Sequence, residues 1–398
     1  MKSVVLVGPL SPQDVSDLLT GRDKRHAEQL QGYRGIPVSE LARALLGRGV
    51  EVQAVTTSTE VDEPLTFDGD NFRLSVQPAR PRARHRALDL FRQERKGLAK
   101  AIRESDAPVI HAHWTYEFAW AAEGAGRPVV VTAHDAPLTI LRHIHDPYRT
   151  LRTIMAYRVR LKVRHLTAVS PYLAKQWRRQ MLYRRPIAIV PNIAPTLAPA
   201  RKQEVSERRL VIDVADAGSR KNVDILIEAF AHVHRAFPDA TLALIGHGLG
   251  ERDPVAGRVG AYPPGTVQLL GPVDRATVAA KLAEAAVFAH PSLEECCSMA
   301  VLEAMNANVP VVAGLRSGGT PWILEGGRAG VLVDERDPQS LARGITQLLA
   351  DPQYSAELSV KAAARISAVF SPEAVVNAYL DCYERAIWAN RDPVTGNP

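Results

Sequence analysis

Two glutamates, Glu295 and Glu303, stand at the ends of the segment ECCSMAVLE. At this spacing both carboxylates could contact one ligand. The segment changes from polar to apolar, which predicts a loop that runs into a partly buried helix. The free backbone amides at such a helix start, at about residues 296–300, bind phosphate with the help of the helix dipole. Carboxylates on either side could then accept hydrogen bonds from the hydroxyls of a ribose and of a second sugar. The spacing fits an alternative equally well, in which Glu295 caps the helix and Glu303 faces solvent.

A site of this kind needs a strand before it, and the chain alternates short apolar, β-branched runs with longer helical patterns. This alternation predicts parallel sheets covered by helices on both faces. In such sheets ligands bind beyond the carboxyl ends of the strands, which is where residue 295 would lie. The predicted strands are 3–7, 51–56, 109–111, 128–132, 165–168, 187–190, 209–214, 241–245, 267–270, 287–289, 309–313 and 330–333. The predicted helices include 37–46, 223–237, 275–284 and 298–306.

The pattern of strands and helices runs through the chain twice. It predicts an α/β protein with two doubly wound, Rossmann-like domains that face a central cleft. The Pro- and Ala-rich segment 191–205 lacks apolar periodicity and is expected to link a first domain, 1–195, to a second, 196–371. Ser371 and Pro372 form a helix start, and we expect the C-terminal helix within 372–398 to pack back toward the first domain.

Composition restricts the class of protein. Among 398 residues the net charge is +6, which is too small to indicate nucleic-acid binding. The three cysteines have neither zinc nor disulfide spacing, which favours a reducing compartment. The first apolar run breaks at Gly8 and Pro9, too early for a signal peptide, and no run is long enough to span a bilayer. We therefore expect a cytoplasmic protein with no nucleic-acid partner.

The segment ECCSMAVLE resembles the glutamate–seven residues–glutamate motif of family 4 glycosyltransferases, which are retaining enzymes of the GT-B fold. The resemblance continues in VPVVAGLRSGGTPWILEGGRAGVLVD at 309–334, RKNVDILIEAF at 220–230 and PVSELARALLGRGVEV at 37–52. It implies transfer of a hexosyl-type sugar from a UDP- or GDP-sugar to an acceptor hydroxyl, with retention at the anomeric carbon. The acceptor would be a glycan, a lipid-linked sugar or a small-molecule glycoside. The resemblance implies no cofactor and no metal, because protein groups neutralise the diphosphate.

The resemblance also implies roles for single residues of the second domain. Glu295 would contact the donor sugar, Glu303 would bind the ribose, and Lys221 would neutralise the diphosphate. The family's arginine a few residues earlier has no counterpart in 213–219, and Arg220 could replace it. Where the family often has Gly-Phe-Gly, this chain has Cys-Cys-Ser, which adds side chains near the sugar. The residues implied to face the diphosphate include Cys297, Ser298, Met299 and Ala300.

His134 follows the predicted strand 128–132 and matches the family histidine that lies under the donor sugar. Its imidazole or its carbonyl could stabilise positive charge at the anomeric carbon, and Asp135 could orient the ring. A purely structural histidine is the alternative. The remaining implied contacts are loop residues after strands, with nucleotide contacts from Gly246, Gly248 and Val273 and phosphate or acceptor contacts from Gly32 and Gly35. A plain helix-entry turn capped by Asp274 is the alternative for Val273.

Two segments of the first domain are basic. Residues 142–185 contain a single acid, Asp146, and residues 79–96 are rich in arginine. These segments could dock on an anionic membrane, at the inner face, and reach a lipid-linked acceptor. The alternative is an ordinary amphipathic helix at 148–164. Its predicted apolar face is Leu151, Ile154, Met155 and Val159, and its predicted solvated face is Arg149, Arg152, Arg160 and Arg164.

Three further features leave alternatives open. The segment HAHWTYEFAW at 111–120 could hold an acceptor sugar on its aromatic rings or could be aromatic core. Asp68-Gly69-Asp70 is interpreted as a hairpin turn and not as a metal site. For the whole chain, a nucleotide-sugar isomerase of the same fold and a nucleotide-sugar-binding protein without activity are the alternative functions.

Overall fold

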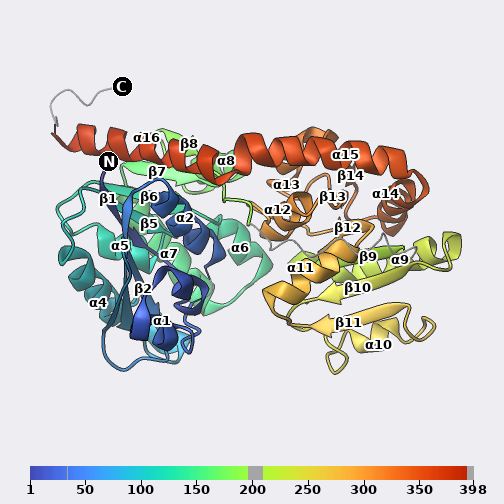
Figure 1. The fold of residues 1–398 in the computed structure, drawn as a ribbon, viewed down its shortest axis with the longest axis horizontal. Helices are drawn as coiled ribbons and strands as arrows, with labels where there is room; N and C mark the ends of the chain where they lie inside the picture. Colours follow the sequence, from blue (N-terminus) through green and yellow to red (C-terminus); the bar gives the residue numbers. More distant parts are fainter. Residues whose placement is uncertain (34, 196–208, 392–398) are drawn as a thin grey trace. The chain divides into compact units, whose positions relative to one another are not determined.

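The computed structural model describes residues 1–33, 35–195 and 209–391. The chain divides into two compact units, Met1–Ile193 together with the C-terminal segment from Pro372, and Ala194–Ser371 (Figure 1). The predicted linker at 191–205 falls largely outside the described residues. Each unit contains one sheet with its own hydrophobic core.

The first unit is built on an eight-stranded sheet of order β3-β4-β2-β1-β5-β6-β7-β8. All neighbours are parallel except β3 and β4, which form a hairpin across the turn at Asp68–Asp70, so the hairpin prediction is confirmed. The inner strands are apolar runs buried on both faces, as parallel strands between helices must be. The strands are β1 (Ser3–Val7), β2 (Glu51–Ser58), β3 (Leu65–Asp68), β4 (Phe72–Pro78), β5 (Ile110–His113), β6 (Val129–Ala133), β7 (His165–Ala168) and β8 (Ile187–Ile189).

Helices cover this sheet, and the last helix of the chain belongs to the same unit. Tyr379 and Tyr383 of α16 are buried in its core. The helices are α1 (Gly21–Ala27), α2 (Ile36–Gly47), α3 (Ala83–Leu88), α4 (Arg92–Arg103), α5 (Glu117–Ala122), α6 (Pro137–His143), α7 (Pro147–Lys162), α8 (Pro171–Gln180) and α16 (Pro372–Arg391).

The predicted faces of the 148–164 helix are partly wrong. Arg152 is buried, 4% exposed, although we predicted it on the solvated face. Ile154 is 51% exposed, although we predicted it on the apolar face. The physical reason is that Arg152 inserts into a cluster of aromatic rings beside the carboxylate of Glu117, at 3.3 Å. The aromatic rings and the carboxylate compensate the buried charge of Arg152, and the amphipathic pattern of the helix does not reveal these partners.

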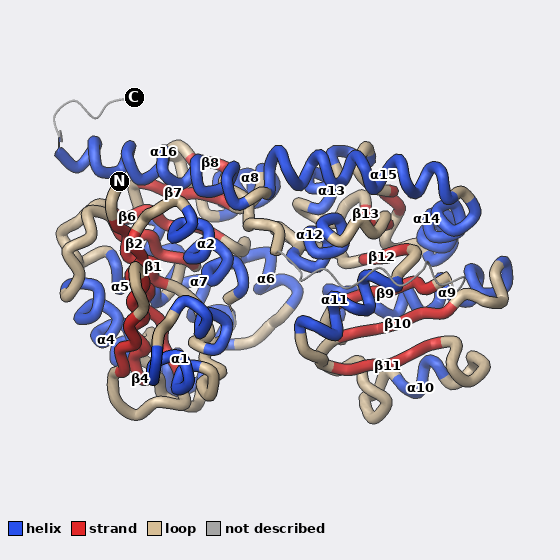
Figure 2. Tube along the Cα trace, viewed as in Figure 1, coloured by secondary structure: helices blue, strands red, loops and turns tan. Residues whose placement is uncertain are grey.

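The second unit has a six-stranded, fully parallel sheet of order β11-β10-β9-β12-β13-β14 (Figure 2). β9 is the first strand of this sheet in the sequence. β10 and β11 lie on one side of it and β12 to β14 on the other, so the strand order reverses between β9 and β12. Ligands of open α/β sheets bind at such a reversal. The strands are β9 (Leu210–Val214), β10 (Thr241–Ile245), β11 (Val267–Gly271), β12 (Val287–His290), β13 (Val311–Gly314) and β14 (Val331–Val333). The helices are α9 (Val223–Ala236), α10 (Ala256–Val259), α11 (Arg275–Glu284), α12 (Met299–Asn306), α13 (Thr320–Ile323), α14 (Pro338–Ala350) and α15 (Pro352–Arg365).

Candidate active site

The candidate site of the second unit lies in the loop between β12 and α12, at the reversal of strand order. Two backbone hydrogen bonds fix the loop. The amide of Leu293 donates to the carbonyl of Arg220 at 2.8 Å, and the amide of Gly319 donates to the carbonyl of Glu295 at 2.7 Å. The first of these bonds joins the glutamate loop to the short turn that carries Lys221. The local fold thereby brings together predicted site residues that lie far apart in the sequence.

Lys221 and Glu295 form an ion pair, with 2.5 Å between Nζ and Oε1. The same carboxylate oxygen accepts a hydrogen bond from Ser292 Oγ at 2.9 Å and lies 3.3 Å from His290 Nε2. The other ring nitrogen of His290 lies 2.8 Å from Asp213 Oδ1. Both side chains of that second pair are fully buried. A chain of alternating charge therefore runs from Asp213 in the core to Lys221 at the end of the sheet.

The pKa values of this chain follow from burial and from neighbouring charge. Burial by itself would lower the pKa of His290, but the carboxylates of Asp213 and Glu295 outweigh it and raise that pKa to about 9. Burial would raise the pKa of Glu295, whereas Lys221 and His290 hold it far below its ordinary value. Burial likewise opposes the charge of Arg220, but Glu295 and Glu294 raise its pKa. At neutral pH His290 is therefore an imidazolium and Glu295 is ionised.

The raised pKa of His290 predicts how stability depends on pH. A group whose folded pKa of about 9 exceeds its ordinary 6.5 stabilises the fold fully below pH 6.5, and this contribution is lost as pH rises through 9. We expect the difference in unfolding free energy between wild type and His290→Gln to shrink from pH 6.5 to pH 9. Urea unfolding at a series of pH values measures it, and a difference that stays constant across this range would contradict the assignment.

The two glutamates of the motif are both buried, at 7% and 8% exposure for Glu295 and Glu303. The N-cap of α12 is Ser298, whose hydroxyl accepts from the amide of Val301 at 3.4 Å. The alternative in which Glu295 caps the helix and Glu303 faces solvent is therefore wrong. Met299 and Ala300 form the first turn of α12 and are partly exposed.

The predicted loop glycines have structural reasons of their own. A Cβ on Gly246 would lie 1.8 Å from the carbonyl oxygen of Ala215, and one on Gly35 would lie 1.8 Å from that of Pro9. Gly246, Gly248 and Gly32 also have positive φ. Asp274 caps α11 by accepting from the amide of Thr277 at 2.7 Å, which matches the alternative for the Val273 turn. The contact of these residues with a nucleotide or acceptor stays a prediction.

His134 belongs to the first unit and lies just after β6. Its Nε2 lies 2.9 Å from Nδ1 of His113, which is the last residue of β5. Burial lowers the pKa of His134 to about 4 and that of His113 well below its ordinary value, so both rings are neutral at pH 7. The neighbouring Asp135 accepts from the hydroxyl of Tyr116 at 2.8 Å. His113 therefore orients the ring of His134.

Aromatic side chains gather near this histidine pair. Tyr33 packs edge-on against Trp114, with 5.8 Å between the ring centroids. The guanidinium of Arg152 lies 3.9 Å from the ring centroid of Tyr116 and 5.3 Å from that of Trp114. Trp114 and Tyr33 are only partly buried, whereas Tyr116 is buried. Part of the segment 111–120 is thus aromatic core, and Trp114 with Tyr33 remains available to a ligand.

Sequence reasoning missed Asp213, His290 and His113. A signal was present for the first two, because a charged residue inside the apolar run LVIDV and a histidine at the end of VFAH need partners in a buried strand. His113 also stands at a strand end, but its partner, His134, lies in the loop after the neighbouring strand β6. The three cysteines are all buried, and none of them forms a disulfide.

Comparison with known proteins identifies both halves of the chain. Residues 38–196 match the family model described as Glycosyltransferase Family 4, and residues 209–351 match the model described as Glycosyl transferases group 1. The chain is 27% identical over 317 residues to a phosphatidyl-myo-inositol mannosyltransferase of Mycolicibacterium smegmatis, covering 76% of this chain and 74% of that protein. A GDP-mannose-dependent mannosyltransferase of the same organism is 33% identical over 175 residues, which are 41% of this chain and 45% of that protein.

Solved structures show the fold. Sucrose-phosphate synthase from Thermosynechococcus elongatus superposes with a TM-score of 0.77 at 20% identity, covering 98% of this chain and all of that one. The Anabaena protein HepE, solved with UDP and glucose, gives a TM-score of 0.68 at 18% identity, over 97% of this chain and all of HepE. The fold is GT-B, with two Rossmann-like parallel-sheet domains, as predicted. The two family models together match most of the chain, and the chain belongs to the family 4 glycosyltransferases.

Proposed function

We propose that this protein transfers a hexosyl group from a UDP- or GDP-sugar to an acceptor hydroxyl, with retention at the anomeric carbon and without a metal. The observation that carries the proposal is the contact between Lys221 and Glu295 at the reversal of strand order, directly before α12. A fixed cation, an ionised acceptor and a helix start meet there, and these are the groups that a sugar diphosphate needs.

The donor half of the mechanism uses the second unit. As the bond between the anomeric carbon and the diphosphate oxygen breaks, negative charge grows on the diphosphate. Lys221, held in place by Glu295, stabilises that charge, and Arg220 adds a second cation. Glu295 accepts hydrogen bonds from the donor sugar, and Glu303 from the ribose, because ionised carboxylates suit hydroxyl donors.

The acceptor half uses the first unit. A new bond forms between the acceptor oxygen and the anomeric carbon, and the departing diphosphate, on the same face of the sugar, takes the acceptor's proton. The neutral ring of His134, oriented by His113, stabilises positive charge at the anomeric carbon without adding a cation there. Trp114 and Tyr33 provide aromatic faces on which a glycan, a lipid-linked sugar or a small-molecule glycoside can stack.

A peripheral contact with an anionic membrane is part of the proposal. On α7, Ile154 and Leu161 are 51% and 62% exposed, and the adjacent Arg160 and Lys162 are basic. Exposed apolar side chains beside cations suit the surface of an anionic bilayer. No helix in the described part of the chain is long and apolar enough to cross a membrane. The proposed location is the cytoplasm, at the inner membrane face.

The experiment that tests the function is a thermal-shift screen against a panel of nucleotide sugars. The matching donor should raise the melting temperature of wild type by mass action, and Glu303→Ala should lose most of that shift, because the ribose loses its acceptor. Glu325→Ala is a matched control, since Glu325 is a glutamate of the same unit that pairs with Arg328 at the surface. A shift that is equal in wild type and Glu303→Ala would contradict the ribose assignment.

The alternatives give different outcomes with the same donor. An isomerase would convert the donor to an epimer without any acceptor. A binding protein without activity would show the thermal shift with neither transfer nor hydrolysis. Transfer to an acceptor with the anomeric configuration of the donor, followed by NMR of the product, supports the proposed function over both.

A further inference from the structure

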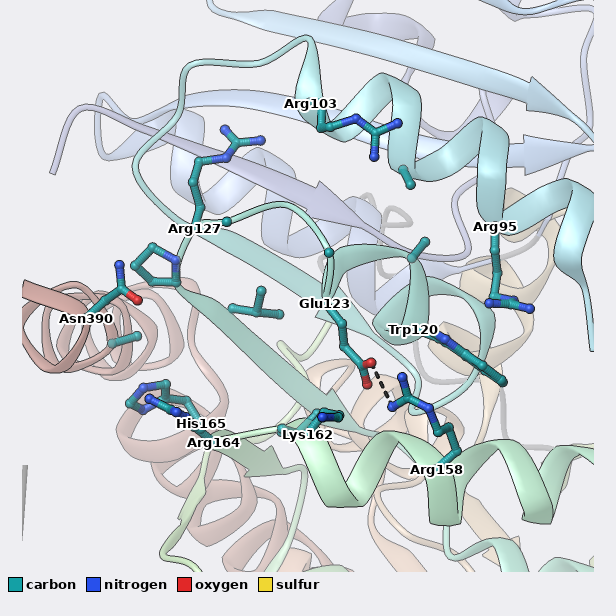
Figure 3. A pocket seen from close by; sticks show the side chains of 18 of the residues that line it. Arg95, Arg103, Trp120, Glu123, Arg127, Arg158, Lys162, Arg164, His165 and Asn390 are labelled. Atoms are coloured by element: carbon teal, nitrogen blue, oxygen red, sulfur yellow. Dashed lines mark hydrogen bonds and ion pairs between the residues drawn. The ribbon is translucent and has the colours of Figure 1, made fainter. Parts of the chain in front are cut away.

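A groove lined by cations lies at the amino edge of the first unit's sheet (Figure 3). Its volume is about 1150 Å³, and nine Arg and Lys side chains line it against a single carboxylate, that of Glu123. The lining includes Pro128, next to the start of β6, and His165, the start of β7. His134 follows the opposite, carboxyl end of β6. The groove is therefore separate from the predicted site of sugar transfer in this unit.

Two helices present most of these cations as rows on either side of α5. Figure 3 shows Arg95 and Arg103 extending from α4 and Arg158 and Lys162 from α7, with Trp120 of α5 between them. Along α4 the basic residues repeat at helical spacing, so that one face of the helix carries a continuous row. The row consists of Arg92, Lys96, Lys100 and Arg103.

Ordinary structural reasons account for only part of this charge. Cations in the last turn of a helix interact favourably with the helix dipole, which explains Lys100 and Arg103. The effect falls off within one turn, so it does not explain Arg92 or Lys96 in the first half of α4. Among the described residues, Lys96, Lys100 and Arg103 make no ion pair.

Trp120 holds two of the guanidinium groups at fixed positions. Cζ of Arg95 lies 3.8 Å from its ring centroid, and Cζ of Arg158 lies 5.0 Å from it. Arg95 Nε donates to the carbonyl of Leu90 at 2.9 Å, and Arg158 pairs with Glu123 at 2.9 Å. Burial lowers the pKa of Arg95, the carboxylate of Asp89 opposes this shift, and the cation of Arg158 adds to it. Arg95 and Arg158 are thus held over one ring with a single ion-paired carboxylate, Glu123, and a bound anion would add to this compensation.

We propose that this groove binds a ligand with two or more phosphate groups, at the edge of the sheet opposite His134. Fixed guanidinium groups match the geometry of phosphate oxygens, and rows on two sides suit an anion with several charges. The phosphate groups could belong to lipid headgroups or to a soluble compound, and the chemistry of recognition is the same. The inference goes beyond the transfer reaction and does not depend on it.

The test uses the full chain with two probes, pyrophosphate in calorimetry and phosphatidylcholine vesicles with or without phosphatidylglycerol in sedimentation. The groove variant is Lys96→Glu/Lys100→Glu/Arg103→Glu, at three exposed positions. The control is Lys175→Glu/Arg178→Glu/Arg179→Glu, which makes the same charge change at exposed positions of α8, outside the groove. Calorimetry is done in a Lys221→Ala background, so that the predicted donor site of the second unit does not contribute.

At physiological salt we expect the groove variant to bind at least one probe about 100-fold more weakly than the protein without these substitutions, because each basic residue near phosphate contributes about fivefold. We expect the control variant to bind that probe with unchanged affinity. Loss of pyrophosphate binding identifies a soluble ligand, and loss of vesicle binding alone identifies lipid headgroups. Equal losses in the groove and control variants would reduce the effect to net charge and overturn the proposal. Absence of binding of both probes to wild type would overturn it as well. Neither result affects the donor assignment, which the Glu303 experiment tests separately.

Discussion

Lys221→Ala is expected to lower kcat by about 10²–10³-fold, which is the usual effect of removing one preorganised group that stabilises developing charge. The expectation follows from the 2.5 Å contact that holds Nζ beside Glu295. KM for the donor should change less than kcat, because the negative charge on the diphosphate increases as the bond to the sugar breaks. Steady-state rates at saturating donor measure the effect.

Two variants complete the test of this lysine. Lys221→Arg keeps the charge but not the shape, so it should recover part of the rate. Lys281→Ala is the matched control, because Lys281 also pairs with a glutamate, Glu284, at 2.9 Å, on the surface of α11 in the same unit. A wild-type rate in both Lys221→Ala and Lys281→Ala would contradict the diphosphate assignment.

Asp213→Asn is expected to have the largest effect on stability, a loss of about 3 kcal/mol in the unfolding free energy. Removing one partner of a buried ion pair typically costs about 3–5 kcal/mol. The lower end applies here because His290 keeps its second carboxylate partner, Glu295, and can also release its proton. Urea unfolding at pH 7 measures the loss.

A surface ion pair of the same unit provides the comparison. Asp239 lies 2.6 Å from Arg209, and both side chains are exposed by more than a third. Asp239→Asn should therefore change the unfolding free energy by less than about 1 kcal/mol. Similar losses for Asp213→Asn and Asp239→Asn would show that His290 gains little from its buried carboxylate.

Most strands could be predicted from the sequence to within about two residues, since parallel strands buried on both faces read as apolar runs. The helix 275–284 was predicted with the bounds that the structure gives to α11. The pair β3 and β4 was recognised only through its turn, because β3 has four residues and β4 alternates apolar with polar residues instead of forming an apolar run. Apolar runs thus predicted the parallel strands throughout, including β8, β11 and β14 at the sheet edges.

The predicted site residues came from the motif, and the groups that hold them came only from the structure. Lys221 and Glu295 lie 74 positions apart, and His111 meets Tyr383 across 272 positions. Contacts over such separations depend on how the strands are ordered, which residue types do not reveal. For the same reason the burial of Arg152 could not be predicted from its helical pattern.

The central claim is that Lys221 recognises a diphosphate, and calorimetry with nucleoside diphosphate and nucleoside monophosphate tests it most directly. The base is that of the donor found in the thermal-shift screen. The account predicts that wild type binds the diphosphate more tightly than the monophosphate and that Lys221→Ala binds the two about equally. The same preference for diphosphate in wild type and in Lys221→Ala would contradict the account.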